Sequence, residues 1–182
     1  MKNRMGNITK GILKTVIGDV TSPQITNENE VPVIPHCCNN LGVMGAGVAL
    51  ALKKKWSGVE VYYKKSVMEL GTISSYVEFT GEFDPPKRTP TVCVFNMIGQ
   101  DGTVSPNNPK PVKYWALAEA MRKIAVKLDA YSLSYPDNKF VIHAPKFGSL
   151  RAGGNFDFVL ELIREIWLEN GIDVVIYEFP DE

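Results

Sequence analysis

The sequence has little cysteine and histidine, with three and two copies respectively among 182 residues. Cys37 and Cys38 are adjacent and Cys93 stands apart, a spacing that fits neither a disulfide framework nor a zinc site. We therefore expect a chain that works in a reducing, cytoplasmic compartment and binds no metal. No apolar run approaches the roughly 18 residues that span a bilayer. The charged start of the chain lacks the apolar segment of a signal peptide.

The chain also has no excess of charge, because twenty lysines and arginines balance twenty aspartates and glutamates. A neutral chain has no general attraction to nucleic acid or to a membrane surface. An anionic ligand must then be held locally, by backbone amides and a few side chains. The length of 182 residues allows one domain with a sizeable core. We expect a single domain over residues 1–182, with residues 1–7 as a loose N-terminal leader.

The most informative stretch runs from His36 to Trp56. The apolar segment 31–35 before it predicts a buried strand, and the apolar face of residues 46–56 predicts a helix. Residues 42–47 between them are mostly glycine and alanine, which leaves the backbone open. The first N–H groups of a helix lack internal partners, and the macrodipole adds about half a positive charge there. This pattern predicts an anion site, with a tight strand-to-helix turn as the simpler interpretation.

A second glycine-rich loop, residues 146–155, also follows a predicted strand and precedes a predicted helix. Strands alternate with helices along the chain, which is typical of an α/β fold. We expect a three-layer α/β/α sandwich around a mixed, mostly parallel sheet. The predicted strands are 8–17, 31–35, 72–80, 91–98, 139–145 and 172–179, and the predicted helices are 46–56, 59–70, 112–128 and 156–170.

The two glycine-rich loops are expected to meet. In open α/β sheets, ligands bind beyond the carboxyl ends of the strands, and residues 42–47 and 147–154 both reach that edge. Two amide-lined loops that face each other suit a diphosphate better than one loop does. Elsewhere we expect an exposed loop over 81–90, and Trp115 and Trp167 in the core.

Five short features lie along nearly the whole chain: Gly18–Thr21 (Gly-Asp-Val-Thr), Asn39, Met44–Ala49, Phe147–Phe156 and Tyr177. In this order they resemble the macrodomain family, which binds ADP-ribose. The first resembles the Gly-Asp-Ile-Thr signature, whose Asp accepts the adenine amino group. The third and fourth resemble the two diphosphate loops. Asn39 resembles the asparagine that bonds the distal ribose, and Tyr177 stands where an aromatic residue often stacks on adenine.

The resemblance implies an ADP-ribose site built from these features. Its ligand-binding residues would be Asp19, Val20, Asn39, Met44, Gly45, Ala46, Gly47, Val48, Gly148, Ser149, Leu150, Arg151, Ala152, Gly153, Asn155 and Tyr177. Leu150 departs from the family pattern, which usually has glycine at that position. Asp19 and Asn39 also fit an interpretation as turn residues that bond only their own backbone.

Two branches of the family bear on activity. Met44–Ala49 followed by Lys53–Trp56 resembles the branch of the terminal ADP-ribose protein glycohydrolase, and His36–Asn39 is similar to the yeast-type ADP-ribose 1″-phosphate phosphatase. The glycohydrolase uses a Lys and an Asp, which Gln100 and Ala152 replace here. Because neither can supply a lysine adduct, we do not expect a mechanism through such an adduct. The resemblance at His36–Asn39 implies the phosphatase reaction as the first hypothesis.

In that reaction His36 would be the catalytic acid or base, and Asn39 would orient the distal ribose. His36 also fits a hydrogen-bonded core residue, as we expect for His143. Two further functions stay open: a reader that binds ADP-ribose without catalysis, and a hydrolase that removes ADP-ribose from protein or nucleic acid. The implied partners are ADP-ribose or ADP-ribose 1″-phosphate, with ADP-ribosylated macromolecules as a further class. We expect no cofactor, no membrane partner and a monomer.

Overall fold

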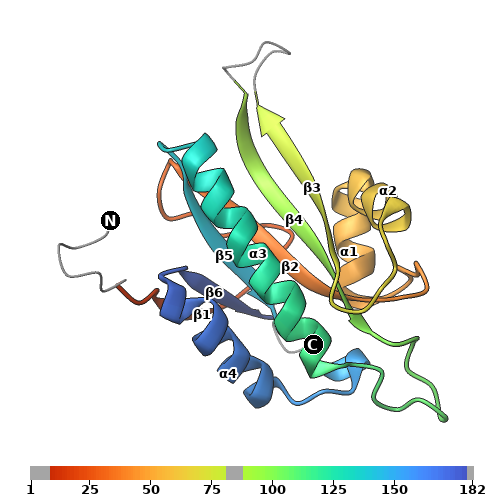
Figure 1. Ribbon diagram of the computed structural model, residues 1–182. Coiled ribbons are helices and arrows are strands. Elements are labelled where there is room, and N and C mark those ends of the chain that lie inside the picture. Colours follow the sequence, from red (N-terminus) through yellow and green to blue (C-terminus); the bar gives the residue numbers. More distant parts are fainter. Residues whose placement is uncertain (1–8, 81–87, 180–182) are drawn as a thin grey trace.

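The computed structural model describes residues 9–80 and 88–179. These residues form a six-stranded sheet in the order β1-β6-β5-β2-β4-β3, with helices on both faces (Figure 1). The strands are β1 Leu13–Ile17, β2 Glu30–Asn39, β3 Ile73–Thr80, β4 Thr89–Gln100, β5 Lys139–Pro145 and β6 Val174–Glu178. The helices are α1 Gly47–Lys55, α2 Ser57–Lys65, α3 Tyr114–Ser134 and α4 Phe156–Ile166, with short 3₁₀ turns η1 Leu150–Ala152 and η2 Leu168–Asn170.

Strand β2 lies at the centre of a mostly parallel sheet. Its Val33 pairs with Cys93 of β4 on one side and with Ile142 of β5 on the other, both in parallel. The pairs β5–β6 and β1–β6 are also parallel, and only β3 runs antiparallel, at the edge beside β4. Strands covered on both faces read as continuous apolar runs, as β2, β4 and β5 do. The predicted α/β sandwich with a mixed, mostly parallel sheet is confirmed.

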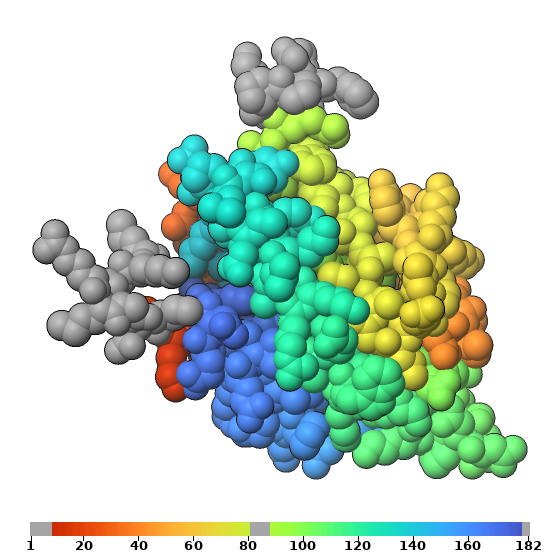
Figure 2. Space-filling view, in the orientation of Figure 1, coloured from red at the N-terminus to blue at the C-terminus, as the bar shows by residue number. Residues whose placement is uncertain are grey.

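The two faces of the sheet carry separate cores. Helices α3 and α4 cover one face, and Figure 2 shows them side by side over it. Phe95, Met97 and Leu117 are buried there with Trp167. Helices α1 and α2 cover the other face, over a cluster that includes Ile34, Leu52, Val59 and Tyr63. None of the described helices combines the length and apolar character that crossing a bilayer requires.

Most predicted elements are confirmed, and β5 has the predicted bounds. The predicted first strand began too early, because only Leu13–Ile17 pairs with β6. The break predicted between two helices at residues 57–58 falls at Trp56 instead, since α1 ends at Lys55 and α2 begins at Ser57 and contains Gly58. Gly58 leaves room for a neighbouring ring, because a Cβ at this position would lie 2.4 Å from Cε2 of Tyr76. Helix α3 continues to Ser134, beyond the predicted end.

One of the two tryptophans predicted in the core is at the surface. Trp167 is fully buried as expected, but Trp115 is 60% exposed. Helix α3 packs on the sheet through the neighbouring Ala116, Leu117 and Met121, so Trp115 lies at the margin of its apolar face. The predicted leader 1–7 and residues 81–87 of the predicted loop lie outside the described residues.

Candidate functional site

A cavity of about 660 Å³ lies at the carboxyl edge of the parallel strands. Each of β1, β2, β4, β5 and β6 contributes its last residues or the segment that follows it. The lining comes from residues 18–21, 36–39, 43, 45–49, 51, 100, 103–104, 145–152, 177 and 179. Residues 42–47 and 147–154 therefore reach the same cavity, as the sequence predicted.

Asn39, the last residue of β2, shapes the first loop. Its Oδ1 accepts the N–H groups of Leu41 (3.0 Å) and Val43 (3.2 Å), and its Nδ2 donates to the Val43 carbonyl (2.8 Å). The Tyr63 hydroxyl donates to the same Oδ1 at 3.0 Å. Asn39 thus lines the cavity and also fixes the path of the chain into α1, so the two interpretations of this residue are compatible.

The N-terminus of α1 opens on the cavity. Its N-cap is Ala46, which has no side-chain oxygen to bond the first N–H groups of the helix. Gly45, Ala46, Gly47 and Val48 all line the cavity. Gly47 has φ +56°, in the left-handed region. The free backbone donors and the positive end of the helix dipole make this wall favourable for an anion.

The second loop forms the opposite wall and is folded tightly. A Cβ on Gly154 would lie 2.0 Å from the Gly148 carbonyl oxygen, so only glycine fits there. Arg151 reaches toward the first loop: a Cβ placed on Gly47 would lie 3.5 Å from Arg151 Cδ. The two glycine-rich loops therefore face each other closely.

At the other end of the cavity, Asp19 follows β1. Its Oδ1 accepts the Thr21 N–H at 2.8 Å, which fixes the orientation of an exposed carboxylate. Val20 is buried beside it, and both residues line the cavity. One oxygen of Asp19 makes the hydrogen bond that the turn interpretation predicts. The carboxylate still lies on the cavity wall.

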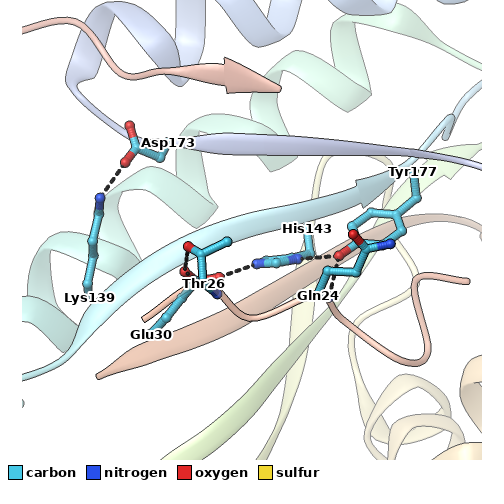
Figure 3. A network of polar contacts seen from close by, with 7 residues as sticks. All are labelled: Gln24, Thr26, Glu30, Lys139, His143, Asp173 and Tyr177. Atoms are coloured by element: carbon cyan, nitrogen blue, oxygen red, sulfur yellow. Dashed lines mark hydrogen bonds and ion pairs between the residues drawn. The ribbon is translucent and has the colours of Figure 1, made fainter. Parts of the chain in front are cut away.

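A chain of hydrogen bonds centred on the buried His143 and Tyr177 anchors this end (Figure 3). Gln24 N–H donates to the Tyr177 hydroxyl oxygen (2.7 Å), which lies 2.8 Å from His143 Nδ1, and His143 Nε2 lies 2.8 Å from Glu30 Oε1. The directions agree if the Tyr177 hydroxyl donates to Nδ1 and Nε2–H donates to the carboxylate. Thr26 Oγ1 donates to the second Glu30 oxygen at 2.9 Å. These hydrogen bonds tie segment 18–26 to β5 and β6, and they give His143 the structural role expected of it.

The aromatic residue with an open face is Phe179 rather than Tyr177. Tyr177 lines the cavity but is only 3% exposed, whereas Phe179 is 68% exposed. Backbone covers part of the Tyr177 ring, since a Cβ on Gly18 would lie 3.7 Å from Tyr177 Cδ1. The two residues share one face because side chains alternate along a strand, so period-2 reasoning could have identified Phe179.

Three predicted ligand residues lie outside the cavity lining. Met44 is buried in the core under α1 and α2. Gly153 has φ +69° and packs on another loop, where a Cβ would lie 2.3 Å from the Pro109 carbonyl oxygen. Asn155 is the N-cap of α4, accepting the Asp157 N–H at 2.8 Å. Glycines that shape a loop and residues that cap a helix have the same sequence signature as ligand-binding residues. This explains why the sequence predicted a ligand role for them.

The loop after β4 forms a further wall of the cavity that the sequence motifs did not predict. Thr103 and Val104, in the loop after β4, line the cavity near Gln100. Asn40 holds this loop against the first one: its Nδ2 donates to Asp101 Oδ1 (3.1 Å), and its Oδ1 accepts the Gly102 N–H (2.8 Å). Since β4 runs parallel to β2, the rule that located the other loops predicts this one too.

Comparison with known proteins identifies the fold. No protein-family model and no curated protein matches the sequence. A Bacteroides thetaiotaomicron protein of unknown function is 27% identical, with a TM-score of 0.68 over 92% of this chain and 98% of its own. A macrodomain protein from Streptomyces coelicolor is 29% identical, with a TM-score of 0.63 over 91% and 98%. Thermosipho africanus DarTG, solved in complex with ADP-ribose, is 18% identical, with a TM-score of 0.60 over 81% of this chain and 38% of its own.

This chain has the macrodomain fold. Its cavity is the opening that the fold makes at the carboxyl edge of its parallel strands. The chemistry available there depends on the few titratable groups that line it.

His36 lies under α1 and α2 and is only 2% exposed. Its Nε2 lies 2.6 Å from Asn96 Oδ1, and Asn96 Nδ2 donates to Ser74 Oγ (3.0 Å) and the Val59 carbonyl (3.3 Å). The amide is therefore oriented so that His36 Nε2–H is the donor. Burial lowers the pKa of His36 to about 4, although the bond to Asn96 opposes this. At neutral pH the imidazole is neutral and engaged in the core.

Cys37 and Cys38, which also line the cavity, are thiols at neutral pH. Burial raises the pKa of Cys37 to about 12, and Gln100 Nε2 lies 3.5 Å from its Sγ. Burial also raises the pKa of Cys38 well above its usual value. A thiolate is the form that attacks, so neither residue is prepared to act as a nucleophile.

The lowered pKa of His36 predicts a loss of stability in mild acid. Its folded pKa of about 4 lies below the ordinary value of 6.5, so between these values the unfolded chain binds a proton that the folded chain does not. From pH 7 to pH 5, His36 alone should reduce the free energy of unfolding by about 2 kcal/mol. Urea denaturation at both pH values measures this. His36→Asn should show a smaller loss than wild type, and equal losses would contradict the assignment.

The hydrogen-bond chain through Tyr177 predicts the effect of removing one hydroxyl. Tyr177→Phe leaves His143 Nδ1 and the Gln24 N–H without their partner, which should lower the free energy of unfolding by about 1–3 kcal/mol. The control is Tyr62→Phe at an exposed tyrosine, where a change of about 0.5 kcal/mol or less is expected. Equal losses of stability in the two variants would argue against the anchoring role of these hydrogen bonds.

Proposed function

We propose that this chain is a single macrodomain that binds ADP-ribose, as a monomer, in the cavity at the carboxyl edge of its sheet. The observation that carries the proposal is the pair of glycine-rich loops that face each other, with the uncapped N-terminus of α1 in one wall. Backbone donors in this arrangement suit a diphosphate. Further support comes from Thermosipho africanus DarTG, which shares the fold and was solved with ADP-ribose.

The lining residues suit the parts of this ligand in order. Asp19 offers a carboxylate oxygen to an adenine amino group, and the open ring of Phe179 offers a stacking surface. The two loops lie between this end and the other, where Asn39, Gln100 and Thr103 present amide and hydroxyl groups to a ribose. The cavity volume of about 660 Å³ is in the range of small-molecule and cofactor sites.

Calorimetric titration with ADP-ribose tests the proposal. We expect saturable binding by the wild-type chain, and binding at least about tenfold weaker in Asp19→Ala, because a charge-assisted hydrogen bond is lost. Asp129→Ala, at an exposed aspartate on α3, is the matched control and should bind as wild type does. Absence of wild-type binding, or tighter binding of AMP than of ADP-ribose, would refute the proposed function.

We further propose that binding is the main activity of the site. The carboxylate of Asp19 lies at the proposed adenine end of the cavity. The pKa values of His36, Cys37 and Cys38 lie far from neutrality, so these groups are poorly suited to acid–base or nucleophilic catalysis at neutral pH. Hydrolysis of ADP-ribose 1″-phosphate stays a prediction that rests on the sequence resemblance and on the place of His36 and Asn39 in the lining. Removal of ADP-ribose from protein or nucleic acid stays a further alternative.

Phosphate release separates the first two functions. With ADP-ribose 1″-phosphate as substrate, we expect the wild-type chain to release phosphate no faster than His36→Ala, because the imidazole is buried and neutral. Release that is lost in both His36→Ala and Asn39→Ala, while ADP-ribose binding survives, would instead establish the phosphatase. The same comparison with an ADP-ribosylated protein tests the third function.

A further inference from the structure

Leu150 and Arg151 lie in the second loop and line the cavity, and Leu150 stands where the family pattern has glycine. Leu150 has φ +46°, the one positive value at a non-glycine residue within 9–80 and 88–179. Its side chain is 87% exposed although the residue lines the cavity. The exposed leucine side chain gains no packing energy that could offset its unfavourable backbone conformation. The surrounding loop must therefore impose this conformation.

The loop imposes it through a tight turn that directs Arg151 across the cavity. Leu150 begins the 3₁₀ turn η1, closed by the Ala152 N–H to the Ser149 carbonyl and the Gly153 N–H to the Leu150 carbonyl, both 2.9 Å. Arg151 follows at the middle of this turn. Its Cδ and Nε lie 3.5 Å and 3.6 Å from the position of a Cβ on Gly47. The side chain therefore spans from the second loop to the N-terminus of α1.

Arg151 is also the cation in the lining that lacks a carboxylate. The lining contains two cations, Lys146 and Arg151, and both lie on the second loop. Lys146 is engaged elsewhere, with its Nζ 2.6 Å from Glu178 Oε1 and 5.6 Å from the centre of the Phe156 ring. Arg151 makes no ion pair with a carboxylate of the described residues. Its charge is thus available where the two loops approach each other.

We propose that Arg151 determines the specificity of the proposed ADP-ribose site. Its guanidinium pairs with the diphosphate from the second loop while the backbone N–H groups of the first loop bind it from the other side. The planar guanidinium matches two phosphate oxygens at once, so the site selects ligands with linked phosphates over those with the same base and no phosphate. This inference rests on the proposed function.

The test compares Arg151→Gln with wild type for ADP-ribose and for adenosine, at low and high salt. We expect Arg151→Gln to bind ADP-ribose at least tenfold more weakly, with a weaker dependence on salt, and to bind adenosine as wild type does. Arg151→Lys should restore part of the affinity, because it keeps the charge but not the paired donors. Arg122→Gln, at an exposed arginine of α3, should leave both affinities unchanged.

The outcomes separate this inference from the function it depends on. Wild-type binding of ADP-ribose that Arg151→Gln retains in full would overturn the role of Arg151 and leave the proposed function standing. Equal loss of ADP-ribose and adenosine binding in Arg151→Gln would also overturn it, since the defect would then be structural. Failure of the wild-type chain to bind ADP-ribose would refute the proposed function itself.

Discussion

The parallel pairing of β1, β6, β5, β2 and β4 is the constraint on which the site depends. Parallel neighbours end at the same edge of a sheet, so five chain segments that are distant in sequence converge there. The antiparallel β3 does not contribute to the cavity lining. The central position of β2 places Asn39 and the start of α1 in the middle of this edge. The cavity is therefore a consequence of topology before any particular side chain is considered.

Where chain direction and local periodicity decide, the sequence was sufficient. The second loop could be placed opposite the first because each follows a buried strand, and β5 has the expected bounds. Asp19 and Arg151 could be located in the same way, as residues just beyond strand ends. Phe179 and the wall at Thr103 follow from the same two rules, the alternation of side chains along a strand and the convergence of parallel strand ends.

Where packing decides, the sequence was insufficient. The state of His36 depends on Asn96, sixty positions away, which only the register of β2 with β4 brings beside it. Trp115 is exposed because α3 turns a neighbouring stripe of residues toward the sheet. Gly58 resembles a helix break, yet it lies inside α2 and leaves room for the ring of Tyr76. In each case the deciding partner lies in another element, and local pattern holds no information about it.

The first loop presents main-chain N–H groups rather than side chains at the wall around α1. Every amino acid except proline carries such a group, so most surrounding residues can be substituted without loss of these hydrogen-bond donors. What evolution must preserve is the course of the backbone, through a few glycines and the asparagine that pins the loop. A scaffold of this kind can diverge widely in sequence by exchanging neighbouring side chains, while the wall of backbone N–H groups stays intact.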